Sequence, residues 1–214
     1  MATFARYYKD RKLNVVPMDK LKEYITDERN KAAIAELIYY RYFERYLKLF
    51  FYDSPETANY IDENGNSKVK NVFKTEYKNG FLMIASNSLL IETLASFLNG
   101  YDKTPRGQSN NAFKAVFSKA EEYKNKLSVF KNINFYQDIR CGILHQGETY
   151  SKFRIIRTGP LFDKKQKKIN ATMFTKELHD FLIKYTEELK KEKWDGDLWD
   201  NCRIKLRHIV NHED

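Results

Sequence analysis

Between Gly80 and Gly100 the sequence reads GFLMIASNSLLIETLASFLNG, which is the most clearly bounded element of the chain. Its apolar density predicts a helix that is buried on most sides, and Gly100 predicts where this helix ends. A narrower strip of small and polar residues runs along the same helix and comprises Ser86, Ser88, Glu92, Ala95 and Ser96. This segment favours a helical domain.

The residues that precede this helix also favour helices. A short helix is expected over 18–25, after Pro17. A long one is expected over 27–52, because apolar residues recur there at steps of three and four, and Ser54-Pro55 predicts its end. The polar stretch 53–70, with DENGNS at 62–67, indicates a surface loop or the tip of a hairpin.

The residues that follow predict more helices and one small sheet. A loop is expected over 102–111, and helices over 112–121 and 135–145. Alternation in FRIIR (153–157), a lysine-rich turn (164–168) and a return strand (169–173) indicate a β-hairpin. Helical periodicity resumes over 174–193, and a last short helix is expected over 194–212.

Composition favours one all-α domain that binds a polyanion. The 214 residues are 42% apolar and 15% aromatic, with 8 Gly and 4 Pro, which suits long helices around a real core. The formal net charge is +9, from 38 Lys and Arg against 29 Asp and Glu, so nucleic acid is a favoured partner. Of these cations 27 are Lys, which also serve as plain solubilising surface.

The cysteines and the N-terminus favour a reduced, cytoplasmic protein. Cys141 and Cys202 are far apart, and no His lies at ligand spacing, so neither a metal site nor a cofactor is expected. The N-terminus MATFAR lacks an apolar region followed by a cleavage site. No apolar run approaches the ~18 residues that span a bilayer, so no membrane association is expected.

The segment RCGILH (140–145) carries the chemistry that we expect. It places four residues between Arg140 and His145, a pattern that recurs at Arg203–His208 and Arg207–His212. The two C-terminal matches lie in the last dozen residues, where fraying is usual. The first match lies mid-chain and follows a long apolar helix, so we favour Arg140 and His145.

This segment and the SLLIETL helix resemble the HEPN superfamily, in particular bacterial HEPN-like ribonucleases and defence proteins. The resemblance covers about 77–190 of a single domain, 1–214. Within it, 1–76 are assigned as N-terminal helices of the same bundle and 194–214 as a helical tail. It implies an antiparallel helical bundle with a small β-hairpin before the last long helix. It also implies a metal-independent endoribonuclease, a homodimer, and the role of a toxin or anti-phage effector with an antitoxin or defence partner.

The residue types suit that chemistry. Metal-free RNA cleavage needs a group with a near-neutral pKa to take a proton from the ribose 2′-OH, as His145 can. It also needs a forked cation for the phosphate and for the charge that develops, as Arg140 can supply. Five helical steps rotate by ~500°, which leaves the two side chains ~140° apart. Either Gly142 bends the segment, or two chains pool their residues across a twofold axis, as the resemblance implies.

Further candidates surround this pair or lie on basic stretches. Residues predicted to support the pair are Glu92, Gln146, Glu148 and Cys141. Basic residues predicted to contact RNA are Arg41, Arg45 and Lys48 among tyrosines, and Lys164, Lys165, Lys167 and Lys168 in the turn. Each has a plainer alternative, such as a solvated face for the basic residues and a small buried thiol for Cys141.

Plainer alternatives exist for the pair and for the whole protein. Arg140 could form an ion pair with Asp138 or Glu148, and His145 could be a hydrogen-bonded residue at a helix end. The superfamily also includes members that bind RNA or nucleotides without cutting. The alternatives to a nuclease are therefore a non-catalytic RNA- or nucleotide-binding module and a regulatory partner protein.

Overall fold

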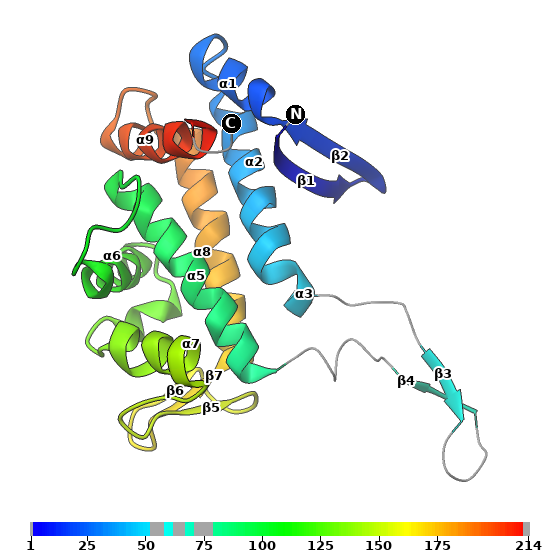
Figure 1. Cartoon of the computed structure of the whole chain (residues 1–214), viewed down its shortest axis with the longest axis vertical. Coiled ribbons are helices and arrows are strands. Elements are labelled where there is room, and N and C mark those ends of the chain that lie inside the picture. The colour runs from blue at the N-terminus through cyan, green and yellow to red at the C-terminus, as the bar shows by residue number, and fades with distance from the viewer. Residues whose placement is uncertain (1, 52–57, 62–66, 71–78, 212–214) are drawn as a thin grey trace.

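The computed structural model describes residues 2–51, 58–61, 67–70 and 79–211, and for the two short middle ranges it describes the strands alone. Three long helical segments form the body of the protein (Figure 1). They are α2 (Lys31–Tyr42) continued by the π-helical turn η1 (Phe43–Leu47) and α3 (Lys48–Phe51), α5 (Gly80–Asn99), and α8 (Ala171–Lys191). The expected mainly helical fold is confirmed.

α5 and α8 run parallel to each other. A Cβ placed on Gly80, at the start of α5, would lie 3.7 Å from the Cβ of Ala171, at the start of α8. Further along, the Asn87 amide donates to the Thr175 hydroxyl at 2.8 Å. Near their C-terminal ends, the rings of Phe97 and Tyr185 have centroids 6.2 Å apart. The prediction of a purely antiparallel bundle is therefore wrong, because α6 and the small sheet return the chain to the end where α5 began.

The segment α2–α3 runs antiparallel to both. Early in α2 the Lys31 ammonium donates to the carbonyl of Glu192, just beyond α8, at 2.6 Å. Later in α2 the Tyr39 hydroxyl lies 3.0 Å from Nε2 of His179, in the middle of α8. Towards its end, the carbonyl of Tyr46 accepts a hydrogen bond from Ser86, near the start of α5, at 2.7 Å.

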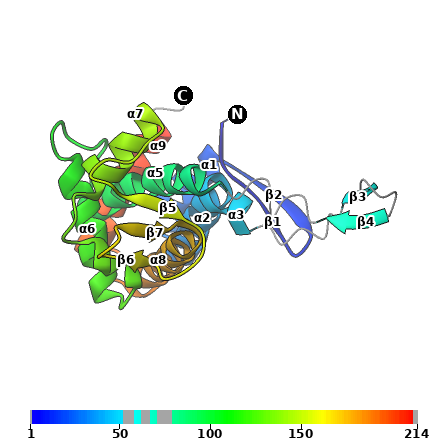
Figure 2. The same cartoon turned by 90° about the horizontal axis from the view of Figure 1, so that it is seen from below.

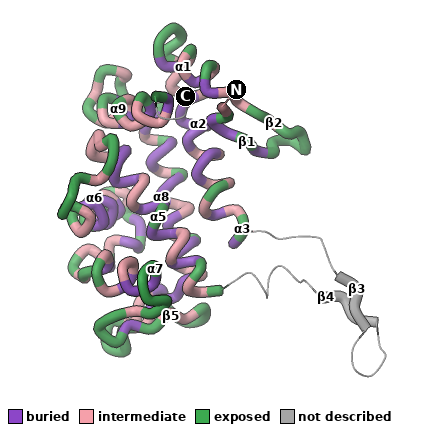
Figure 3. Tube along the Cα trace, in the orientation of Figure 1, coloured by how far each residue is buried: buried purple, intermediate pink, exposed green. Residues whose placement is uncertain are grey.

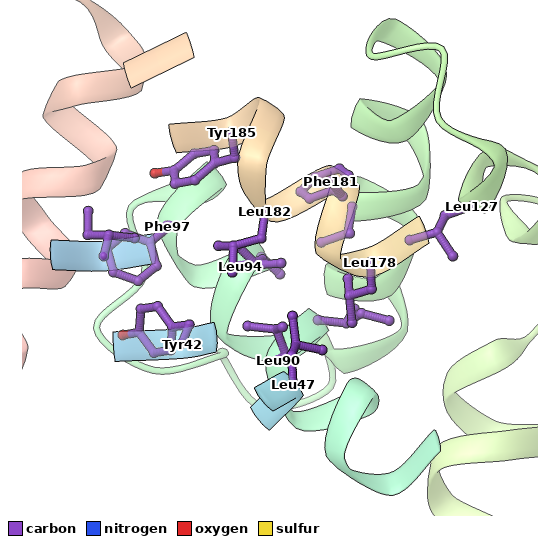
Figure 4. Close-up of a cluster of buried hydrophobic side chains, with 14 of the residues drawn as sticks. Tyr42, Leu47, Leu90, Leu94, Phe97, Leu127, Leu178, Phe181, Leu182 and Tyr185 are labelled. Atoms are coloured by element: carbon purple, nitrogen blue, oxygen red, sulfur yellow. The ribbon is translucent and has the colours of Figure 1, made fainter. Parts of the chain in front are cut away.

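The hydrophobic core lies between these helices. Figure 4 shows residues of α2 and η1 facing residues of α5 and α8, with Leu127 closing one side. The buried residues run along the inner faces of the long helices, while the exposed residues lie mainly in the loops and on the outward faces of the shorter elements (Figure 3). Glu92 is the only charged residue among the 20 residues of α5. The element that packs beside Glu92 must therefore provide a partner for its carboxylate.

Shorter elements cover this core, namely α1 (Met18–Thr26), α6 (Ser109–Glu122), the 3₁₀ turn η2 (Lys126–Phe130) and α9 (Asp197–Asn211). α9 lies across one end of the bundle (Figure 1) and buries Trp199, Cys202 and Leu206 completely. The C-terminal helix is thus a packed part of the core. The expectation of a fraying tail is wrong for the described part of this helix.

An N-terminal hairpin precedes the helix expected over 18–25, which is present as α1, so the assignment of 1–76 to helices is wrong for its first residues. β1 (Thr3–Lys9) and β2 (Lys12–Pro17) pair antiparallel, and Phe4 and Ala5 of β1 are buried. β3 (Ala58–Ile61) and β4 (Ser67–Lys70) form a second antiparallel pair within the stretch predicted as a loop or hairpin tip. The predicted tip at 62–66 and the predicted stop at Ser54-Pro55 lie outside the described residues.

The predicted hairpin over 153–173 is a three-stranded sheet of order β5-β7-β6. Its strands are β5 (Arg154–Ile156), β6 (Phe162–Asp163) and β7 (Lys168–Asn170). β5 pairs parallel to β7, so these two strands are not a hairpin, and the prediction is wrong on this point. The lysine-rich turn instead joins β6 to β7, which pair antiparallel.

Other helix boundaries shift by a few residues. The helix expected from residue 27 begins at Lys31, because the Asn30 side chain caps it by accepting from the N–H of Ala33. α8 begins at Ala171 for the same reason, since Asn170 caps it through the N–H of Met173. Residues 171–173, predicted as strand, are therefore the first turn of a helix.

α5 is long and apolar enough to cross a membrane, with a mean hydropathy of 1.6. This corrects the expectation that no run approaches such a length. Within the bundle 56% of its most apolar 18-residue window is buried, as in the core helix of a soluble protein. The helix is thus covered by protein on most sides.

His179 makes the stability of this packing depend on pH. Burial among Tyr39, Phe43 and Phe51 lowers the pKa of His179, and Asp180 offsets this only in part. The unfolded chain therefore takes up the proton first. The free energy of unfolding should fall as the pH drops below about 6.5, the ordinary histidine value, towards the lower pKa of the folded state.

We expect His179→Gln, which does not titrate, to reduce the loss of stability between pH 7.5 and pH 5 in urea unfolding. His145→Gln, which changes an exposed histidine, is the matched control and should retain the wild-type loss. An unchanged pH dependence in His179→Gln would show that this burial does not govern it.

Candidate functional site

The motif segment is a helix of two kinds. η3 (Tyr136–Cys141) is a π-helical turn that contains Arg140, and α7 (Gly142–Gln146) is a short α-helix that contains His145. The predicted helix over 135–145 is thus present, although its first part is wound more widely than an α-helix. Such π-turns occur often at functional sites. α7 ends at Gly147, which adopts the left-handed conformation with φ 70°.

After Gly147 the chain folds back against the motif helix. The N–H of Glu148 donates to the carbonyl of Gly142 at 3.3 Å, and the N–H of Tyr150 donates to the carbonyl of Asp138 at 2.7 Å. A Cβ on Gly142 would overlap the carbonyl oxygen of Glu148 and lie 3.2 Å from Cα of Thr149. Gly142 itself is ordinary helix, with φ −57° and ψ −53°. The expected bend at Gly142 is therefore wrong, and glycine is required there for close packing of two backbone segments.

A bidentate ion pair fixes Arg140 against the central helix. Nε of Arg140 donates to Oε1 of Glu92 at 2.7 Å, and Nη2 donates to Oε2 at 3.3 Å. The guanidinium also lies over the ring of Tyr136, 5.4 Å from its centroid. The alternative pairs do not form, since Asp138 instead accepts a hydrogen bond from Ser151 and the exposed Glu148 has no ion pair within the described chain.

The Glu92 carboxylate leaves part of the Arg140 guanidinium available. A guanidinium has five N–H donors, and Glu92 takes one on Nε and one on Nη2. The remaining donors, on Nη1 and Nη2, form the terminal fork that matches two phosphate oxygens. Nη1 has no hydrogen-bond partner within the described part of the chain. The arrangement orients the arginine and leaves its fork open for an anion.

Arg140 also stays charged in this setting. Partial burial lowers the pKa of Arg140, but the hydrogen bond and the negative charge of Glu92 outweigh it and raise the pKa overall. Its side chain is 18% exposed, so part of it reaches solvent.

His145 lies on α7, directly after the π-helical turn that contains Arg140, and it is exposed. Leu144, Gln146 and Glu148 are exposed as well. Within the described residues no hydrogen bond or ring contact joins His145 to Arg140, and neither Gln146 nor Glu148 forms a side-chain hydrogen bond or ion pair. The structure therefore places these candidates on one surface without bringing the predicted pair into contact within a single chain.

The two cysteines differ in their surroundings. Cys141 is half-buried beside Arg140, so the simple interpretation as a buried thiol fits it poorly. Cys202 is fully buried in α9, and this burial raises the pKa of its thiol to about 12. Within the described residues no group of three or more His, Cys, Asp and Glu could hold a metal ion.

The motif helix lies at the most basic end of the protein. The segment 136–170 contains eight Lys and Arg against three Asp and Glu, so it carries more than half of the net charge of +9. α7 and the strands β5, β7 and β6 lie at the same end of the bundle (Figure 2), and β5 and the turn before β7 carry cations. The exposed cations here are Lys152, Arg154, Arg157, Lys164, Lys165 and Lys167, and Lys168 is half-buried.

Sequence reasoning missed three of these cations. Lys152, Arg154 and Arg157 lie in or next to the stretch 153–157, whose alternating pattern predicts a strand. That pattern gives no sign of a cationic surface. A local count of charge would have revealed them. Of the predicted lysines, Lys167 also donates to the carbonyl of Ser151 at 2.9 Å, which ties the turn to the motif's return segment.

The basic stripe on α2 and η1 is elsewhere, on the edge of the bundle that carries the N-terminal hairpin (Figure 1). Arg41 is 3% exposed, donates to the carbonyl of Phe4 and stacks over its ring, so the prediction that Arg41 contacts RNA is wrong. It attaches β1 to α2. Lys48 pairs with Glu44 at 2.7 Å, while Arg45 is exposed.

The other two Arg-to-His patterns are set aside on new grounds. Arg203 donates to the carbonyl of Trp194 and to Asp200, and its guanidinium lies 4.8 Å from the centroid of the Trp194 ring. The guanidinium of Arg203 is thus hydrogen-bonded to neighbouring parts of the chain. For the third pattern, Arg207 is exposed, while His212 lies outside the described residues.

Comparison of this chain with family models, with curated protein sequences and with solved structures gives no significant match. The function must therefore be argued from the site itself.

Proposed function

We propose that this protein is a metal-independent endoribonuclease of the HEPN type, in which Arg140 binds the scissile phosphate and His145 is the general acid and base. One observation supports this above the others. The carboxylate of Glu92 holds Arg140 by its Nε edge, so that the terminal fork keeps donors without a partner in the described chain, and the exposed His145 follows five residues later on the motif helix. A purely structural ion pair would not need a histidine on the same helix or a basic surface around it.

The reaction is an internal transfer of the phosphate. The ribose 2′-oxygen attacks the adjacent phosphorus while an unprotonated His145 takes the 2′-OH proton. A new bond forms between O2′ and phosphorus, and the bond between phosphorus and O5′ breaks. A protonated histidine gives its proton to O5′, and Arg140 stabilises the extra charge on the non-bridging oxygens. The products are a 2′,3′-cyclic phosphate and a 5′-hydroxyl.

Two chains are needed to complete this site. Within one chain no contact joins Arg140 to His145, so we propose that the arginine of one copy acts together with the histidine of the other. Exposed leucines lie near the motif, with Leu82 and Leu89 of α5 and Leu144 of α7 exposed by 48%, 40% and 39%. The first two are seven residues apart and so share one face of α5. We propose that a second copy covers this face and brings its own arginine and histidine to a shared cleft.

The basic end would guide the RNA. Exposed cations from β5 and the turn before β7 lie beside the motif helix, and they can neutralise phosphates along a strand without reading its bases. A cytoplasmic toxin or anti-phage effector, restrained by an antitoxin or another defence component, is the cellular role that fits such an activity.

A second candidate is an RNA-binding protein that does not cut. The Glu92 carboxylate already offsets the charge of Arg140, which favours a static contact over strong stabilisation of a transition state. In that case binding would be sensitive to salt, and no cleaved product would form.

The first test is cleavage of labelled single-stranded RNA in EDTA, with analysis of the product ends. We expect cyclic phosphates, and no cleavage of the same RNA with 2′-O-methyl groups, because the attacking hydroxyl is then blocked. His145→Ala should lower the rate by about 100-fold or more. Arg140→Lys, which retains charge without the fork, should lower it by about 100-fold. A wild-type rate in His145→Ala would refute the assignment, and RNA binding without product would favour the second candidate.

The shared cleft is tested by mixing two inactive variants, Arg140→Ala and His145→Ala. A mixed dimer retains one arginine and one histidine at the cleft, so we expect part of the activity to return after subunit exchange. The mixture should be compared with each variant alone at the same total concentration. If each chain held a complete site by itself, the mixture would stay as inactive as its components.

A further inference from the structure

A second basic site lies at the opposite end of the protein, between α1 and α9 (Figure 1). A pocket of about 610 Å³ opens there, within the size range of small-molecule sites. It is lined by Lys22, Ile25, Thr26 and Arg29 of α1 and the turn after it, by Trp194 and Asp195, and by Arg203, Arg207, Val210 and Asn211 of α9.

The charge of this pocket points to an anion. Four cationic side chains line it against one carboxylate, that of Asp195. Lys22 lies 3.8 Å from Asp19, and Arg203 pairs with Asp200, so these two cations are partly balanced. Arg29 and Arg207 have neither an ion pair nor a side-chain hydrogen bond within the described residues. Their donors are available to a ligand.

The pocket also has an apolar wall. The indole of Trp194 is half-buried and lies against the fully buried Trp199, with ring centroids 4.8 Å apart. Ile25 and Val210 add aliphatic surface. A ligand that fits should therefore combine a negatively charged group with a flat or apolar part.

Arg29 is one of seven non-glycine residues with a positive φ in the described part of the chain. This residue adopts the left-handed conformation with φ 47°, just after α1, where glycine is the usual residue. An arginine in this conformation is strained, and residues held in such conformations cluster at functional sites. The strain is offset if the guanidinium has a task in the pocket that it lines.

We propose that the pocket between α1 and α9 binds a nucleoside phosphate. The phosphate would accept hydrogen bonds from Arg29 and Arg207, and the base would lie against the apolar wall that includes Trp194. This site does not depend on the proposed nuclease, because it shares no residue with the motif helix. It also gives a role to Arg207, the arginine of the third Arg-to-His pattern, which the nuclease leaves unused.

The test is titration of the full-length protein with the four common nucleoside monophosphates and triphosphates, with adenosine, and with inorganic phosphate. Binding is followed by calorimetry and by tryptophan fluorescence. The chain has 2 tryptophans, and Trp199 is fully buried, so a change in emission would report on Trp194. We expect at least one nucleotide to bind more tightly than adenosine and than phosphate. Its phosphate can contact the cationic side chains while its base contacts the apolar wall.

Arg29→Gly separates a ligand contact from a structural role. It removes the side chain and also relieves the left-handed strain, so stability should be unchanged or higher while nucleotide affinity falls by about tenfold or more. Arg11→Gly is the matched control, because Arg11 is also left-handed, with φ 63°, but lies in the exposed turn of the N-terminal hairpin. Its nucleotide affinity should equal that of the wild type.

Three results would overturn the proposal. The first is no binding of any nucleotide at millimolar concentration. The second is binding of inorganic phosphate as tight as that of every nucleotide, which would indicate a general anion site. The third is an equal loss of affinity in Arg29→Gly and Arg11→Gly, which would show that net charge alone governs the binding.

Discussion

The central helix α5 contains a single charge, and the site depends on how that charge is satisfied. A carboxylate on a mostly buried apolar helix needs a cationic hydrogen-bond partner, because burial without one is strongly unfavourable. Glu92 finds that partner in Arg140, whose side chain arrives from a π-helical turn in the next part of the fold. The ion pair therefore orients the arginine of the motif segment, which also contains the exposed His145, and it connects the core to the surface where we propose that RNA is cut.

The surrounding packing makes this pairing possible. α5 and α8 run parallel, so the return from one to the other passes through α6, the motif helix and the small sheet at one end of the bundle. Gly142 lets the return segment pass close over the motif helix, where any side chain would overlap the carbonyl of Glu148. The same topology gathers the cations of β5 and of the turn before β7 near the motif. The opposite end is closed by α1 and α9, whose own basic pocket is built from unrelated residues.

Sequence periodicity was sufficient for most of the helices, and Gly100 predicted the end of α5, because both signals act locally. The Asn170 cap was missed, since 169–173 were predicted as a strand, although α8 begins at Ala171. Glu92 was placed near Arg140 only through a family resemblance, since the two residues are 48 positions apart and no local rule joins them. Sequence patterns gave wrong predictions where contacts between distant parts of the chain determine burial or strand pairing. Arg41 looks like a surface cation in a helical stripe, yet the carbonyl and ring of Phe4 bury it. The parallel pairing of β5 with β7 likewise depends on a strand, β6, too short to be recognised from alternation.

The most direct measurement of the central claim is a double-mutant cycle on RNA cleavage, with Glu92→Gln, Arg140→Ala and the double variant under single-turnover conditions. Glu121→Gln, which removes a carboxylate from an exposed ion pair with Lys131, is the control for loss of charge and should cleave at the wild-type rate. If Glu92 acts by orienting Arg140, Glu92→Gln should slow cleavage by about tenfold in the wild type and have no further effect once Arg140 is alanine. Equal slowing in both backgrounds would contradict this claim, because Glu92 would then act independently of the arginine.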